Sequence, residues 1–183
     1  MGKLLLGLVF ATLDLDLTSE TGTVIGLLPD AIGYILILIG MKEMRLFSYI
    51  FSKGTGLALG AAMASASMYI FNLFGGSNSL SLSALLIELA EMVLRSLVIY
   101  FITKGLRDME QEIGLELRGK TLHWVWLGMT VITAVSYISA WIPLVSGIAA
   151  LASGLLSICY LALFYLAKCN FDEYMEELAE EGE

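Results

Sequence analysis

Histidine, cysteine and proline are scarce in this sequence of 183 residues, which has one His, two Cys and two Pro. The single histidine, His123, has no cysteines clustered near it and offers no zinc ligand set. Cys159 and Cys169 form no CxxC pair, which argues against a thiol redox enzyme. The sequence also lacks HExxH, GxSxG, P-loop and dinucleotide-binding glycine patterns. It therefore predicts no enzymatic activity and no cofactor, and it leaves the question of a metal open.

Charge of either sign is also sparse outside the C-terminal end. Ten Lys and Arg stand against eighteen Asp and Glu, for a net charge of −8. Seven of the acidic side chains lie within residues 172–183. Scattered basic residues and an acidic tail argue against a nucleic acid as a partner, because such proteins need a concentrated basic surface.

Apolar residues are abundant instead, at 58% of the chain, and the mean hydropathy is +0.82. Soluble domains contain about 45–50% apolar residues. A soluble fold of this size could not bury so much apolar surface, because a large part of a small domain faces water. The composition therefore predicts an integral membrane protein.

Long apolar stretches predict an all-α bundle of about six transmembrane helices, the first of them short. A helix needs roughly 20 residues to cross about 30 Å of hydrocarbon. The expected segments are 3–17, 24–41, 54–74, 82–103, 121–142 and 144–167. Together they form one transmembrane domain over residues 1–168, followed by an acidic cytoplasmic tail over residues 169–183.

The basic residues test this count. Nine of the ten Lys and Arg fall at the N-terminus, in alternate connections or after the last segment, and the opposite connections contain none. The positive-inside rule makes the basic side cytoplasmic. We therefore predict a multi-pass protein of a cell membrane with both termini in the cytoplasm.

Small residues at regular spacing predict where helices approach closely. Such stripes allow backbones to come together in lipid, where no hydrophobic drive brings helices together. Three stripes occur at Gly26, Gly33 and Gly40, at Gly56, Gly60 and Ala64, and at Ser146, Ala150 and Gly154. The tryptophans Trp124, Trp126 and Trp141 fall at the two ends of the fifth segment, where indole prefers the membrane interface.

The most informative charges lie in the fourth segment, where Glu88, Glu91 and Arg95 share one helical face. A charge at the middle of a bilayer costs roughly 2.5–3.5 kcal/mol, so this face is expected to point toward protein or water. Glu91 and Arg95 have the spacing and order of an ion pair within one helix. Two interpretations follow: a structural Glu91–Arg95 pair with Glu88 reaching the headgroups, or a functional site.

Asp30 is the second candidate and directly follows Pro29. Proline and an acidic residue suit the first turn of a helix, because proline lacks an N–H and the acid faces the positive end of the dipole. In that interpretation Asp30 only starts a helix. In the other, Asp30 joins Glu88 and Glu91 in an acidic site in the outer half of the bilayer.

Asp14 and Asp16 would form a vestibule at the mouth of this site. Several carboxylates with one Arg would attract a proton, a metal or other cation, or a cationic group of a solute. A helix interrupted at Pro29 would resemble the broken helices from which transporters build ion sites.

The C-terminal tail has its own pattern. Phe171, Tyr174, Met175 and Leu178 recur at helical spacing against an acidic face, which is typical of an amphipathic helix. The tail either stays solvated or docks a basic cytoplasmic partner.

One short segment carries a family resemblance. The run Leu28-Pro29-Asp30-Ala31-Ile32-Gly33-Tyr34, with Gly40 and Lys42 after it, resembles uncharacterised small polytopic membrane proteins of Gram-positive bacteria that carry a Leu-Pro-Asp-x-x-Gly-Tyr segment. The resemblance covers about fifteen residues and implies a bacterial cytoplasmic membrane but no particular activity. In size and helix number, the chain also resembles the substrate-capturing subunits of energy-coupling vitamin transporters, in topology alone.

Two functions follow as expectations. The first is transport or solute binding, with Asp30, Glu88 and Glu91 binding a cation or proton and Arg95 as the charge partner that holds Glu91 in place or neutralises it. The second is a non-catalytic accessory, regulatory or assembly protein whose charges fix helix register. The expected partners are the lipid bilayer, a small cationic solute or proton, and a membrane or cytoplasmic protein.

Overall fold

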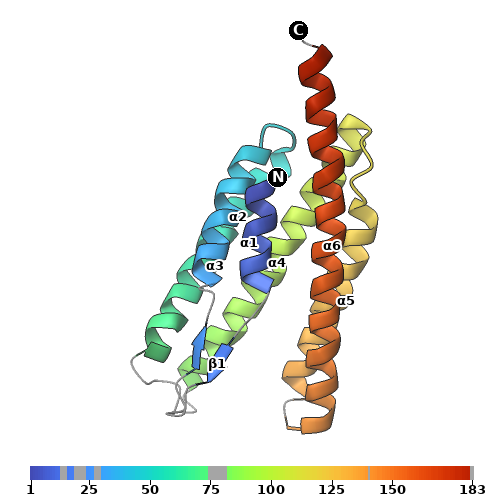
Figure 1. Cartoon of the computed structure of the whole chain (residues 1–183). Helices are drawn as coiled ribbons and strands as arrows, with labels where there is room; N and C mark the ends of the chain where they lie inside the picture. Colours follow the sequence, from blue (N-terminus) through green and yellow to red (C-terminus); the bar gives the residue numbers. More distant parts are fainter. Residues whose placement is uncertain (13–15, 19–23, 27–29, 74–81, 140, 182–183) are drawn as a thin grey trace. The chain divides into compact units, whose positions relative to one another are not determined.

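The computed structural model describes residues 1–12, 16–18, 24–26, 30–73, 82–139 and 141–181 (Figure 1). This part of the chain is all-α apart from one short hairpin, as expected. Its six helices are α1 (Gly2–Thr12), α2 (Asp30–Met44), α3 (Tyr49–Leu73), α4 (Leu82–Ile113), α5 (Gly119–Ile138) and α6 (Pro143–Glu181). The strands are β1 (Asp16–Thr18) and β2 (Val24–Gly26).

The chain forms two compact units that divide within α4. The N-terminal unit comprises Gly2–Phe101 and the C-terminal unit comprises Ile102–Glu183. The N-terminal unit contains α1, the hairpin, α2, α3 and the first part of α4, and the C-terminal unit contains the rest of α4 with α5 and α6.

In the N-terminal unit, α1 packs on α2 and α2 packs on α3. Glycines bring α1 and α2 together: a Cβ added to Gly7 would lie 2.6 Å from the carbonyl oxygen of Gly33, and one added to Gly40 would lie 2.9 Å from the backbone nitrogen of Leu4. Any side chain at these positions would push the two backbones apart. Of the stripe predicted at Gly26, Gly33 and Gly40, the last two make a close helix contact, whereas Gly26 lies in β2 and not on α2.

The hairpin changes the first two expected segments. The helix expected over 3–17 ends at Thr12, and the one expected over 24–41 covers Asp30–Met44. Between them, β1 and β2 pair antiparallel, with Asp16 opposite Gly26. At 1.5 Å per residue, α1 and α2 are about 16 and 22 Å long, shorter than the hydrocarbon core of a bilayer.

Two other helices are longer than the apolar segments from which they were predicted. α4 continues ten residues past the expected end at residue 103, and α6 continues to Glu181, through most of the acidic tail. Gly114, with φ +76°, follows the last residue of α4, a conformation open to glycine and typical of helix ends. Pro143 is the first residue of α6, where its missing N–H costs nothing.

The C-terminal unit is built on the contact between α5 and α6 and on the C-terminal part of α4. Thr103 in α4 and Tyr160 in α6 share a 2.9 Å hydrogen bond, and both side chains are buried. In the connection from α4 to α5, the Gly119 N–H donates to the carboxylate of Glu110 at 3.0 Å. The bond to Glu110 holds the start of α5 to the end of α4, across the irregular segment between them.

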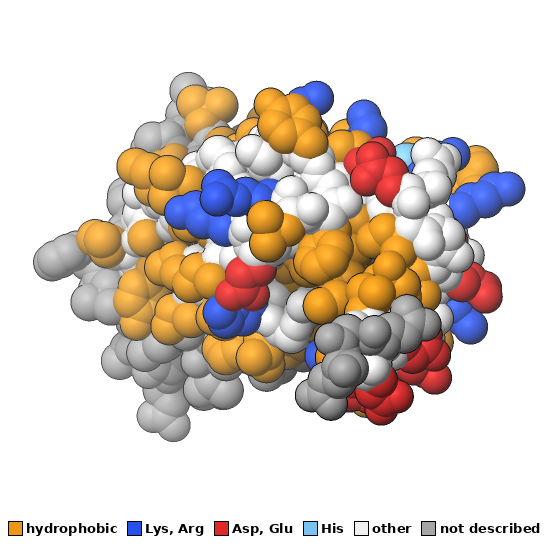
Figure 2. All heavy atoms as spheres, turned by 90° about the horizontal axis from the view of Figure 1, so that it is seen from above, with side chains coloured by type: hydrophobic (Ala, Val, Ile, Leu, Met, Phe, Trp, Pro, Cys, Tyr) orange, Lys and Arg blue, Asp and Glu red, His pale blue; other side chains and the backbone are white. Residues whose placement is uncertain are grey.

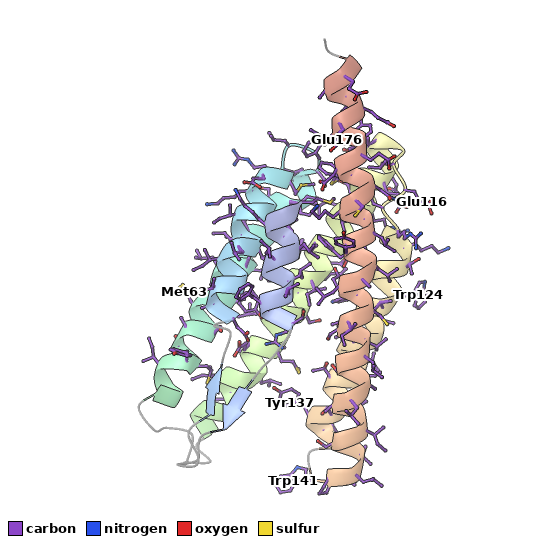
Figure 3. The ribbon with its side chains drawn as sticks, in the orientation of Figure 1. Met63, Glu116, Trp124, Tyr137, Trp141 and Glu176 are labelled. Carbon is purple, nitrogen blue, oxygen red and sulfur yellow. The ribbon has the colours of Figure 1, made fainter. Side chains whose placement is uncertain are left out.

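Within the described residues, two helices are long and apolar enough to cross a membrane: α5 over Gly119–Ile138 and α6 over Pro143–Glu180. Only 11% of the apolar window of α5 and 22% of that of α6 are buried, whereas the core helix of a soluble protein is mostly buried. Trp124 and Trp141 lie near the two ends of α5 and project away from the ribbon (Figure 3). They are 64% and 93% exposed.

The other two small-residue stripes do not form close contacts. A Cβ on Gly56 or Gly154 would meet nothing within 4 Å, and one on Gly60 would meet Leu94 only at 3.8 Å. No described neighbouring helix packs closely on these stripes, in contrast to the face of Gly33 and Gly40.

Candidate functional site

Asp30 is the first residue of α2, the position that the Pro29–Asp30 sequence predicts. Its carboxylate lies at the N-terminal end of the helix, where the unpaired backbone N–H groups favour a negative charge. The side chain is only 13% exposed. Asp30 therefore starts a helix and is also largely withdrawn from solvent.

Arg95 of α4 approaches this carboxylate from another helix. Its Nη2 donates to Oδ2 of Asp30 at 2.9 Å, in an ion pair between groups 65 positions apart. The Arg95 side chain is 29% exposed, so the pair is partly shielded from water. A charged hydrogen bond of this length is among the stronger polar contacts in proteins.

Tyr34 completes the contact and was not among the residues singled out from the sequence. Its hydroxyl accepts a hydrogen bond from Nε of Arg95 at 3.3 Å, and its side chain is fully buried. The signal that identifies it is its spacing: Tyr34 follows Asp30 by four residues and so lies on the same face of α2. One guanidinium thus contacts two side chains on successive turns of one helix.

Glu91 belongs to the same group of charges. It lies one turn before Arg95 on α4, and its carboxylate interacts electrostatically with Tyr34, as do Asp30 and Arg95. Two carboxylates, one guanidinium and one phenol therefore gather around the first turns of α2. We call Asp30, Tyr34, Glu91 and Arg95 the charged cluster.

The remaining predicted acids fall differently. Glu88 is in α4 by its backbone, but its side chain lies outside the described part of the chain. Asp14 also lies outside the described residues. Asp16 begins β1, and its side chain is not described. Of the five acids predicted for the site and its vestibule, only the side chains of Asp30 and Glu91 lie in the described part of the chain, and the acidic site stays a prediction.

The sequence predicts that Arg95 pairs with Glu91 on its own helix. It did not suggest the contact of Arg95 with Asp30. Arg95 contacts the acid of a different helix, which ties α2 to α4. A guanidinium has five donors and can serve more than one acceptor, so the contact with Asp30 does not exclude one with Glu91. The Glu91–Arg95 pair stays a prediction.

The other polar side chains in the described ranges are ordinary by comparison. His123 stacks near Trp126 with ring centroids 5.3 Å apart, and both cysteines are free and exposed. Among the described residues, no three His, Cys, Asp or Glu side chains are grouped as metal ligands. In α6, Lys168 forms an ion pair with Asp172, one turn further along the same helix. None of these gathers opposite charges from separate helices as the charged cluster does.

The charged cluster contains two acidic side chains, Asp30 and Glu91, and one basic side chain, Arg95. They lie beside a fully buried tyrosine, where solvation is poor. Such a group can accept a proton, attract a cation, or hold α2 and α4 in register.

Comparison of the chain with protein-family models, with curated proteins and with solved structures gives no match.

Proposed function

We propose that this chain is a multi-pass protein of the bacterial cytoplasmic membrane that binds a proton or a small cation at the charged cluster, in the service of transport or solute binding. The observation that carries the proposal is the ion pair between Arg95 and Asp30, with Glu91 one turn before Arg95 on α4. This role requires that the charged cluster lie inside the bilayer.

The membrane setting is supported by how apolar side chains are displayed. α5 and α6 are long, apolar and mostly unburied, which in water would expose a large hydrophobic surface. In the N-terminal unit, α3 exposes Leu59, Met63 and Ile70 along its length. Lipid is the solvent in which these faces are stable, and the basic connections then lie on the cytoplasmic side.

In that setting the acids of the charged cluster are costly. Carboxylates within a bilayer usually pair, take up a proton or line an ion path. Asp30 pairs with Arg95, and a proton or a small cation that joins the cluster would make its occupancy sensitive to pH or to cation concentration.

A second function has one observation in its favour. Asp30 is already paired, and an ion pair between two helices fixes their register without any ligand. In that case the chain is an accessory or assembly protein, and the charged cluster only holds α2 and α4 in register. The two functions differ in whether anything binds.

Thermal unfolding of the purified chain in detergent separates them. The melting temperature would be followed from pH 5 to pH 9 and with Na⁺, K⁺, divalent metals, ammonium and organic amines. A ligand that binds only the folded state raises the melting temperature by mass action. The variants are Asp30→Asn, Glu91→Gln and Glu88→Gln. Glu112→Gln is the matched control, because Glu112 is an exposed acid on the same helix.

Binding predicts a rise with one cation or with protons in the wild type and in Glu112→Gln. That rise is lost in Asp30→Asn and Glu91→Gln. If no ligand shifts the melting temperature and those two variants are only less stable, the charged cluster is structural and the second function holds.

A further inference from the structure

The turn between α2 and α3 is short and tightly bonded. α2 ends at Met44 and α3 begins at Tyr49, and the Phe47 N–H donates to the Met44 carbonyl at 3.0 Å. Ser48 caps α3, because its Oγ accepts the Ile50 N–H at 3.2 Å. The backbone of this turn is therefore held in one course by hydrogen bonds.

Those side chains combine positive charge with apolar surface. Lys42, Arg45, Leu46, Tyr49 and Lys53 are all exposed, with Leu46 at 83% and Tyr49 at 71%. Lys53 Nζ lies 5.3 Å from the centroid of the Tyr49 ring. We call these five residues the basic corner. It lies at the upper end of α2 and α3 in Figure 1, and Figure 2 views that end, where Lys and Arg side chains lie among hydrophobic ones.

The positive charge of the corner is not balanced locally. The nearest acid in the sequence is Glu43, and its carboxylate is taken by an ion pair with Lys3. Among the described residues, none of Lys42, Arg45 and Lys53 forms an ion pair. In a chain with a net charge of −8, this part of the structure thus has three cations without an ion pair at the turn and in the adjoining ends of α2 and α3.

We propose that the basic corner binds the phosphate headgroup of an anionic phospholipid in the cytoplasmic leaflet. This inference rests on the membrane placement given under the proposed function. Ammonium and guanidinium groups recognise phosphate, and basic residues next to a membrane segment attract anionic headgroups. Tyr49 suits the boundary between headgroups and acyl chains, and Leu46 enters the acyl region. An acidic protein segment would satisfy the cations but would leave the leucine without an apolar environment.

Each Lys or Arg close to a membrane surface strengthens anionic lipid binding roughly fivefold. Replacing all three cations should therefore weaken it about one-hundredfold. The full chain would be purified in detergent and titrated with short-chain phosphatidylglycerol, phosphatidylcholine and water-soluble glycerol 3-phosphate. The test variant is Lys42→Gln/Arg45→Gln/Lys53→Gln. The matched control is Arg107→Gln/Arg118→Gln/Lys120→Gln, which removes the same charge from the end of α4, the connection after it and the start of α5.

We expect the wild type and the matched control to bind phosphatidylglycerol at least tenfold more tightly than phosphatidylcholine. The test variant should lose this preference while keeping its melting temperature in phosphatidylcholine. Leu46→Ser should weaken both lipids and leave the preference intact. Should the test variant not fold, Lys42→Gln and Arg45→Gln alone should each cost about fivefold.

Three results would overturn the inference. The first is a test variant that keeps the preference for phosphatidylglycerol. The second is competition by glycerol 3-phosphate as strong as that of the lipid, which would make the site one for free phosphate. The third is an equal loss in the matched control. Failure of the proposed function looks different: the chain would not sediment with membranes, or Asp30→Asn would leave cation binding unchanged while the lipid preference persists.

Discussion

The carboxylate of Asp30 and the guanidinium of Arg95 lie 65 positions apart in the sequence and 2.9 Å apart in the fold. The contact joins the first turn of α2 to α4, and Tyr34 receives a second hydrogen bond from the same guanidinium. In a poorly solvated setting, the loss of one partner leaves an uncompensated charge behind. The consequence depends on which partner is lost.

Removing the positive charge should cost more than removing the negative one. Arg95→Gln leaves Asp30 and Glu91 without a guanidinium, so we expect a loss of about 3 kcal/mol in the free energy of unfolding. Asp30→Asn leaves Glu91 and Arg95 balanced and should cost about 1–2 kcal/mol. Unfolding in mixed micelles measures both.

The control for this comparison is Glu112→Gln, which should stay within about 0.5 kcal/mol of the wild type because it changes an exposed residue. The double variant Asp30→Asn/Arg95→Gln should cost less than the sum of the single changes, because the partners share one interaction. Additive costs would show that the two groups do not stabilise each other.

Part of this arrangement could be predicted from local rules. Pro29 followed by Asp30 predicts the start of α2, because both residues suit the first turn of a helix. Gly33 and Gly40 predict a close helix contact by their spacing. The sequence shows that Arg95 needs a partner. Pairing between residues four positions apart, however, identifies only partners on the same helix. A partner on a distant helix depends on tertiary packing, which the spacing of residues does not contain.

The ends of the helices show a second limit. Hydropathy marks the stretch that suits lipid, whereas backbone hydrogen bonding continues wherever good helix formers follow. α4 therefore continues past residue 103 to Ile113, and α6 continues into the acidic residues. The hairpin of β1 and β2 was missed because strands of three residues are too short to show an alternating pattern.

The contact between α1 and α2 should tolerate no added side chain. In Gly7→Ala the new Cβ would lie 2.6 Å from the backbone oxygen of Gly33, so the helices must separate. We expect a loss of about 1–3 kcal/mol in the free energy of unfolding. Gly154→Ala is the matched control, because a Cβ there meets nothing within 4 Å. It should be neutral or stabilising, since alanine favours a helix by about 1 kcal/mol over glycine. Similar losses in both variants would contradict the close contact.

Thr103 and Tyr160 share a hydrogen bond, and removing one partner or the other should lower the free energy of unfolding by different amounts. Thr103→Val keeps the side-chain shape but leaves the buried Tyr160 hydroxyl without its partner at 2.9 Å, so we expect a loss of about 1–3 kcal/mol. Tyr160→Phe should cost less, because Thr103 has a further interaction. Denaturation of the two single variants and of the double variant measures the coupling between them. A larger loss in Tyr160→Phe would reverse the expected order.

If α5 crosses the membrane, its two ends must be accessible from opposite sides. Lys120 lies near its first residue and Trp141 just beyond its last, and the positive-inside rule assigns the Lys120 end to the cytoplasm. In a background of Cys159→Ser and Cys169→Ser, which removes both exposed thiols, Trp141→Cys should react in intact cells with a thiol reagent that cannot cross membranes. Lys120→Cys should react with it only after permeabilisation. Labelling of both positions in intact cells would mean that α5 does not cross, and labelling of Lys120→Cys alone would invert the predicted orientation.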